Sequence, residues 1–221
     1  MITKKMIVNI KLQEGIMDRY FYECDGVKLS AFYSESYDGL VLGGGGGALK
    51  ELYIPKMIDG IVVKAVAGEF LECLHGFDRV IIDEDNEYFS VADGVLFNKD
   101  KTEVICYPPG RTDESYCVPE GVKMICDCSL GNENLRKIVL PAGLEEIEQY
   151  AVTGCKNLEE ITIPKSLKRV FMKAFMWCEN LKEVYYDGSA EEWSKIDFTM
   201  FNDYLTNAHI NYNCKIEKEN G

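Results

Sequence analysis

A repeat of 23 residues restricts the fold of this chain more than any other feature of its sequence. Residues 135–157 read LRKIVLPAGLEEIEQYAVTGCKN, and residues 158–180 read LEEITIPKSLKRVFMKAFMWCEN. Apolar residues, proline, alanine and cysteine recur at matching positions of the two copies. Further copies, some more diverged, cover residues 49–60, 77–83, 116–134 and 181–189. A period of about 20 to 50 residues is typical of solenoids and other stacked repeats.

The pattern inside one copy predicts how the units stack. In LxxIxIP the apolar residues alternate, which predicts a short strand with one face inward, and proline ends the strand because it has no N–H to donate. A second inward-facing LxxI segment follows, and then AFxxC or AVxxC predicts a short helical or 3₁₀ turn. One unit cannot bury its own apolar edge, whereas units stacked about 4.8 Å apart can.

The fold class that follows is an α/β solenoid of leucine-rich-repeat type. It has a parallel β-sheet on one face, with short strands and 3₁₀ or helical turns on the other. We expect Cys155 and Cys178 to be buried and stacked, and we expect Cys73 at the same interior position. Strands in parallel register are expected near residues 51–54, 79–82, 137–140, 160–163 and 183–186.

The unit LxxIxIPxxLxxIxxxAFxxCxx resembles the BspA-like leucine-rich repeat, the bacterial Treponema pallidum type. The segment NEYFSVADGVLFNKDKTEVICYPPG, residues 86–110, is similar to the hairpin-bearing unit of that family. VYYDGSAEEWSKI, residues 184–196, and LTNAHINYN, residues 205–213, are similar to its C-terminal cap. The unit at Cys126–Leu130 departs from the pattern, because Ser-Leu stands where Ala-Phe is usual. The resemblance implies a non-enzymatic repeat scaffold that binds another protein.

The same comparison of segments suggests how the chain is organised within one domain. An N-terminal capping segment with a β-hairpin is expected over 1–48. Leucine-rich repeats follow over 49–183, including the hairpin-bearing unit 86–110. A C-terminal cap is expected over 184–213 and a polar tail over 214–221.

Charge and the N-terminus restrict partner and location. The 221 residues carry a formal net charge of −13, which phosphate backbones and anionic membranes would repel. We therefore expect no nucleic acid and no membrane insertion. The resemblance adds the expectation of a protein partner and no cofactor, with the oligomeric state open. The apolar stretch Met6–Leu12 is interrupted by Asn9 and Lys11, so no signal peptide is predicted. The cytoplasm is the default location, and the cell surface or secretion is the alternative.

A run of five glycines, Gly43–Gly47, satisfies the dinucleotide pattern G-x-G-x-x-G/A together with Ala48. A phosphate site needs a helix directly after the glycines, because its N-terminus faces the pyrophosphate. Here ALKELYIP follows, which alternates and ends in proline, so it predicts a strand. The run is therefore interpreted as a flexible surface turn without a ligand.

Other candidate motifs lack the partners that their chemistry needs. Cys126 and Cys128 form C-x-C without a second close pair for zinc, and a disulfide on oxidation is left open among the nine cysteines. His75 lies near Cys73, but no third orienting group is evident. DEDNE, residues 83–87, lacks the glycine and glutamate of a calcium loop. Trp193 is interpreted as part of the cap, and Trp177 as either a contact residue or packing.

The outward residues of the predicted strands are the main functional candidates. If Ile138 and Leu140 point inward, Lys137 and Val139 point outward, and the same alternation applies to the other copies. One column is charged: Glu51, Arg79, Lys137, Glu160 and Glu183. Its neighbour is mostly apolar or aromatic: Tyr53, Ile81, Val139, Thr162 and Tyr185.

An exposed stripe of this kind beside charges is typical of a contact surface, although β-propensity alone also favours these residues. Protein binding through this stripe is the first hypothesis. A cell-surface adhesin or glycan-binding module is the alternative. An enzyme is a remote alternative that would need a pocket joining His75 or His209 to a carboxylate and a cysteine.

Overall fold

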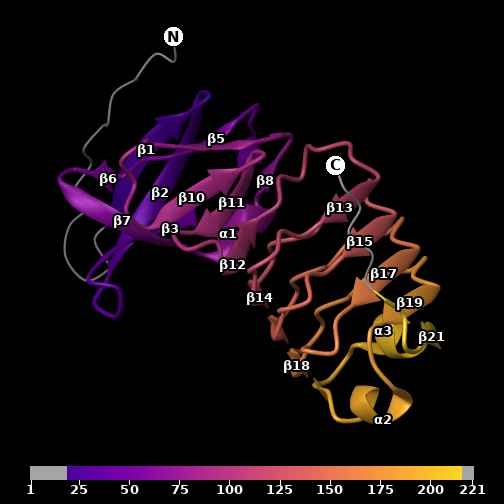
Figure 1. Ribbon diagram of the computed structural model, residues 1–221. Coiled ribbons are helices and arrows are strands. Elements are labelled where there is room, and N and C mark those ends of the chain that lie inside the picture. The colour runs from indigo at the N-terminus through magenta and orange to yellow at the C-terminus, as the bar shows by residue number, and fades with distance from the viewer. Residues whose placement is uncertain (1–18, 216–221) are drawn as a thin grey trace.

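The structure is a computed structural model that describes residues 19–215 of the chain. The signal-peptide prediction for the first 15 residues and the tail from residue 216 lie outside this range. Figure 1 shows a β-rich N-terminal part followed by a stack of short strands that runs to the C-terminus.

The N-terminal part is built on a five-stranded sheet in the order β1-β2-β3-β7-β6. Asp25-Gly26 connects β1 to β2, Asp59-Gly60 connects β6 to β7, and all four residues have positive φ. Two such residues form the tight turn that suits an antiparallel hairpin, which explains these connections. The strands are β1 (Arg19–Cys24), β2 (Val27–Ser34), β3 (Gly39–Gly44), β6 (Met57–Ile58) and β7 (Ile61–Val66).

Two small parallel pairs and one short helix lead from this sheet toward the repeats. The pairs are β4 (Gly47–Ala48) with β8 (Leu74–His75), and β5 (Leu52–Ile54) with β9 (Val80–Ile82). The helix α1 (Gly68–Glu72) buries Phe70 and Leu71.

A hairpin joins the two hydrophobic cores of the molecule. It consists of β10 (Phe89–Ala92) and β11 (Val95–Asn98), and it turns at Asp93-Gly94 before β12 (Glu103–Cys106) continues the sheet. Val95 and Phe97 pack into the core of the repeats, whereas Leu96 packs into the N-terminal core. Both faces of β11 are therefore buried, which accounts for its uninterrupted apolar run.

The repeats form two parallel ladders. We call the first the front ladder: β13 (Ser115–Cys117), β15 (Lys137–Val139), β17 (Glu160–Ile163), β19 (Glu183–Tyr186) and β21 (His209–Asn211). The second is the side ladder, which continues from β12 through β14 (Met124–Ile125), β16 (Glu146–Ile147), β18 (Arg169–Val170) and β20 (Asp197–Phe198).

The front ladder confirms the solenoid and its register, with Ile138, Ile161 and Val184 fully buried. The segments predicted near 51–54 and 79–82 also pair in parallel, but as β5 and β9 they form a separate two-stranded sheet. The LxxI segments, predicted only to face inward, form the side ladder.

The cysteine prediction is correct for two residues and wrong for one. Cys155 and Cys178 are buried, and their thiols donate to the carbonyls of Leu130 (3.3 Å) and Val152 (3.1 Å) in the preceding repeat. Cys73 is exposed, and Leu74 occupies the interior in its place. The interior position was assigned to Cys73 instead of Leu74, one residue too early, because the helix α1 replaces the usual turn.

Ser129 is a buried hydroxyl in a position that the neighbouring repeats fill with Ala151 and Ala174. Its Oγ makes no hydrogen bond to any described residue. Burying a hydroxyl without a partner costs about 1 kcal/mol or more, so Ser129→Ala is expected to raise the free energy of unfolding by about 1 kcal/mol. Urea unfolding measures the change.

Ser166→Ala is the matched control, because the Ser166 hydroxyl donates to the Leu144 carbonyl at 2.6 Å. This variant is expected to lose stability. If both variants change stability in the same direction, the missing hydrogen bond is not what distinguishes Ser129.

The C-terminal end of the stack is covered by two short helices, α2 (Ala190–Trp193) and α3 (Asp203–Thr206). Ser189 and Glu192 form a capping box that begins α2. The Trp193 ring packs against Tyr186 and Phe198 at centroid distances of 5.1 and 5.0 Å. This packing matches its interpretation as a covering residue.

The glycine run lies at the surface as expected, but it is not a turn. Gly43 and Gly44 end β3, and Gly47 begins β4. A Cβ on Gly44 would lie 2.3 Å from the Ser30 Oγ, and one on Gly45 would lie 2.7 Å from the Lys28 carbonyl oxygen. The glycines therefore permit close approach to β2.

Candidate functional site

The outward face of the front ladder brings six of the ten predicted residues together. In the register of the sheet, Lys137 lies beside Glu160, and Glu160 lies beside Glu183. Val139, Thr162 and Tyr185 form the adjacent column. Five of the six side chains are half-buried, and Thr162 is 9% exposed. We call these six residues the front face.

The other four predicted residues lie apart from the front face. Glu51 and Arg79, which come directly before β5 and β9, form an ion pair. The Tyr53 hydroxyl donates to Asp83 at 2.8 Å, and the same carboxylate accepts from the Lys56 backbone N–H. Burial and this hydrogen bond raise the pKa of Tyr53 well above its usual range. The polar groups of this part of the stripe are therefore engaged in internal contacts.

Sequence reasoning missed the two end rungs of the front ladder. Ser115 and Cys117 continue the two columns on one side, and His209 and Asn211 continue them on the other. The signal was weak because the repeat at 116–134 is one residue short and α2 and α3 lengthen the last spacing. The Asn211 side-chain amide donates to Glu183 at 2.8 Å.

Tyr185 is the aromatic residue of the front face. Burial raises its pKa, and the neighbouring carboxylates of Glu160 and Glu183 raise it further. No described residue accepts a hydrogen bond from its hydroxyl. Tyr185 thus offers an aromatic ring and an unused phenol next to two carboxylates.

The side ladder presents a different surface. Its outward column contains, in order, Glu103, Met124, Glu146, Arg169 and Asp197, and Arg169 pairs with Asp197 at 2.7 Å. Beside it, Glu145 pairs with both Lys123 and Lys168. Several neighbouring charges on this ladder form ion pairs. On the front face, by contrast, a charged column lies beside a mostly apolar one.

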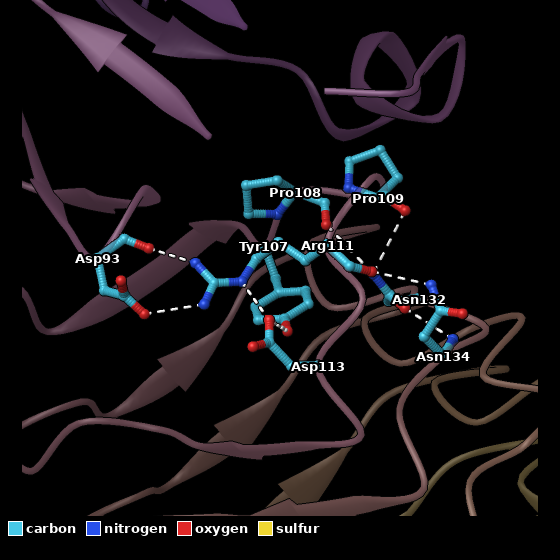
Figure 2. A network of polar contacts seen from close by, with 8 residues as sticks. All are labelled: Asp93, Tyr107, Pro108, Pro109, Arg111, Asp113, Asn132 and Asn134. Atoms are coloured by element: carbon cyan, nitrogen blue, oxygen red, sulfur yellow. Dashed lines mark hydrogen bonds and ion pairs between the residues drawn. The ribbon is translucent and has the colours of Figure 1, made fainter. Parts of the chain in front are cut away.

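A polar clamp interrupts the ladder between β9 and β13. Figure 2 shows the Arg111 guanidinium between the carboxylates of Asp93, in the hairpin turn, and Asp113. The Arg111–Asp113 distance is 2.6 Å, and Tyr107 donates to the same carboxylate at 2.9 Å. The hydrogen bond from Arg111 has the largest effect on the pKa of Asp113 and lowers it. The hydrogen bond from Tyr107 lowers this pKa further, although partial burial acts in the opposite direction. An open depression of about 510 Å³ lies here, lined by residues 78–79, 93–94 and 110–113.

Asn132 holds the other end of this loop in place. Its side-chain amide donates to the carbonyls of Pro108, Pro109 and Arg111 at 3.1 to 3.3 Å (Figure 2). Asn132 stands at the repeat position that Cys155 and Cys178 occupy further on. All three side chains donate to the preceding rung, and the sequence pattern did not reveal this role for Asn132.

The remaining candidate motifs are dispersed. Cys128 donates to the carboxylates of Glu72 (3.1 Å) and Asp127 (3.3 Å), and burial raises the pKa of its thiol. Within residues 19–215, no three His, Cys, Asp or Glu side chains gather as metal ligands would. His75 and His209 are exposed on separate strands, and Trp177 is 50% exposed. None of the helices in the described part of the chain is long and apolar enough to cross a bilayer.

Two stacked parallel ladders around one apolar core define a leucine-rich-repeat solenoid. Residues 113–220 match the sequence profile of the BspA-type leucine-rich repeat region in six copies. The repeats within these residues therefore have the BspA-type leucine-rich-repeat pattern.

Three solved structures are similar to parts of this chain. A leucine-rich repeat protein from Eubacterium ventriosum is 28% identical with a TM-score of 0.52, over 62% of this chain and 36% of that one. The pneumococcal vaccine antigen PcpA is 21% identical with a TM-score of 0.42, over 77% of this chain and 57% of its own. A leucine-rich cell surface protein from Faecalibacterium prausnitzii is 21% identical with a TM-score of 0.41, over 69% and 52%.

The chain therefore spans between 36% and 57% of the length of these structures. A search of the curated proteins finds no match.

Proposed function

We propose that this chain is a non-enzymatic scaffold that binds another protein through the front face. The observation that carries the proposal is the contrast between the two ladders. The side ladder carries three ion pairs on its outward surface, whereas the front face places a column of Val139, Thr162 and Tyr185 beside its charged residues. Interfaces combine an apolar or aromatic centre with a polar surround in this way.

The geometry favours a partner that contacts several rungs at once. The front ladder is five strands wide, and its rungs are spaced by about 4.8 Å, so its columns extend over about 20 Å. A protein segment can contact successive rungs along this length. Tyr185 supplies the largest contact area of the six residues, and aromatic side chains often dominate binding energy.

Tyr185→Glu is expected to weaken partner binding at least about tenfold, because it removes the aromatic ring, and with it the apolar contact, from the centre of the front face. Affinity capture from cells of the source organism, with the tagged full chain as bait, identifies the partner. Titration of the purified partner then measures the change in affinity.

Tyr204→Glu is the matched control, since Tyr204 is an exposed tyrosine (39%) on α3 rather than on the front ladder. It should bind as the wild type does. Undiminished binding by Tyr185→Glu, with a normal circular dichroism spectrum, would exclude the front face as the binding surface.

A further inference from the structure

Charged side chains at matching positions of successive repeats alternate between positive and negative, except on the front face. Four columns of such residues alternate in charge from one repeat to the next. These are Glu114, Arg136, Glu159 and Lys182; Lys123, Glu145 and Lys168; Glu133, Lys156 and Glu179; and Glu146, Arg169 and Asp197. Opposite charges on neighbouring rungs stabilise a sheet, and like charges destabilise it. The alternation is therefore what stacking alone favours.

The charged column of the front face departs from this alternation. Glu160 and Glu183 are direct neighbours in parallel register. Glu183 accepts one hydrogen bond from Asn211, and no described residue donates to the carboxylate of Glu160. By contrast, Glu159, one position earlier in the chain, pairs with Arg136 at 2.8 Å. Lys137 lies beside Glu160 on one side, but among residues 19–215 no cation lies between the adjacent carboxylates of Glu160 and Glu183.

The apolar column lies directly beside these carboxylates. Tyr185 lies two residues after Glu183 on the same face of β19, and the strand register places it diagonally opposite Glu160. A ring face attracts cations, and an aliphatic stem packs on it favourably. A lysine or arginine side chain fits both contacts: its apolar stem can pack on the Tyr185 ring, and its cationic head can pair with the two carboxylates.

We infer that the front face binds a basic segment of a partner protein, with an arginine or lysine head between Glu160 and Glu183 and its stem on Tyr185. This inference rests on the proposed function and adds the chemistry of the partner. The formal net charge of −13 attracts the same class of partner from a distance. A cation from the partner, placed between Glu160 and Glu183, would give this column the alternation of charge that the other four columns have.

The test uses the full 221-residue chain and a fluorescein-labelled peptide of alternating arginine and threonine. Fluorescence anisotropy at about 50 mM NaCl, where exposed charges are only partly screened, measures binding. Wild type should bind this peptide and should not bind the matched peptide of alternating glutamate and threonine. Glu160→Gln/Glu183→Gln should weaken binding at least about tenfold.

Glu159→Gln/Glu179→Gln is the control, since it removes the same total charge from alternating columns. It should change binding by less than about twofold. Equal weakening in both double variants would show attraction to total charge and overturn the inference, as would failure of the wild type to bind. Glu160→Gln/Glu183→Gln should also melt no lower than wild type, because it relieves a repulsion. A lower melting temperature would contradict the assigned repulsion.

The two proposals fail in different ways. If Glu160→Gln/Glu183→Gln binds the captured native partner like wild type while Tyr185→Glu does not, the front face binds a partner of other chemistry. If Tyr185→Glu also leaves native binding unchanged, the front face is not the site and both proposals are wrong.

Discussion

Asn132→Ala is expected to lower the free energy of unfolding by about 3 kcal/mol. The Asn132 side chain is 3% exposed, and its amide donates to three carbonyls of the loop 108–111. Its oxygen also accepts from the Asn134 backbone N–H at 2.8 Å. Each buried group left without a partner costs about 1 to 3 kcal/mol, and this substitution removes the partner of several groups at once.

The loop depends on this donor because of its own sequence. Pro108 and Pro109 have no N–H with which to join a ladder, and their carbonyls face the Asn132 amide. Arg111 follows after Gly110, and its guanidinium pairs with Asp93 in the hairpin turn. Loss of Asn132 should therefore loosen the junction between the two hydrophobic cores, which hydrogen exchange of residues 107–117 detects as faster exchange.

Asn134→Ala is the matched control for this prediction. Asn134 also donates to the Arg111 carbonyl, at 2.9 Å, but it is exposed, so water replaces the lost hydrogen bond. Its loss should cost no more than about 1 kcal/mol. Similar losses for Asn132→Ala and Asn134→Ala would mean that burial of the amide is not what makes Asn132 important.

Gly45→Ala is expected to cost about 3 kcal/mol and to destabilise the N-terminal sheet selectively. Gly45 has φ +105°, a conformation that L side chains rarely adopt. A Cβ there would lie 2.7 Å from the Lys28 carbonyl oxygen and 3.1 Å from the Leu29 Cα. Both contacts involve the backbone of β2, which cannot rotate away, so strain and steric overlap add.

Two other glycines distinguish the backbone strain of a positive φ from the steric overlap with β2. Gly60 also has positive φ (+81°), but nothing lies within 4 Å of a Cβ built on it, so Gly60→Ala should cost about 1 kcal/mol from strain alone. Gly143 has open space and no positive φ, so Gly143→Ala should be neutral or slightly stabilising. Thermal unfolding of the three variants measures the order. If Gly45→Ala costs no more than Gly60→Ala, β2 yields to the added methyl group.

The repeat made the fold predictable from sequence. LxxIxIP specifies which side of each strand is buried, so Ile138 and Ile161 could be assigned to the core and Lys137 and Glu160 to the outside. Proline marked where each strand ends. Errors arose where the pattern was interrupted: Cys73 follows the helix α1, and the glycine run is held by strands that only the folded chain brings together.

The candidate site was predictable only in part. Sequence alternation identified both columns of the outward stripe, but it gave no reason to separate Tyr53 from Tyr185. The two tyrosines differ because Asp83 accepts a hydrogen bond from Tyr53, whereas Tyr185 has carboxylates beside its ring and no acceptor for its hydroxyl among the described residues. Contacts between residues 30 positions apart are not visible in a local pattern.

The sequence by itself determined the stacked repeat, the inward residues and the outward columns. These follow from short-range periodicity, because each unit buries its apolar residues against an almost identical neighbour. The tertiary structure decided where the ladder is interrupted, and hence that six of the ten stripe residues form one surface. It also showed that, among the described residues, no cation lies between Glu160 and Glu183, whose place in one column the repeat had already predicted. These features depend on which rungs meet, and the hairpin, the proline loop and Asn132 set that through contacts distant in sequence.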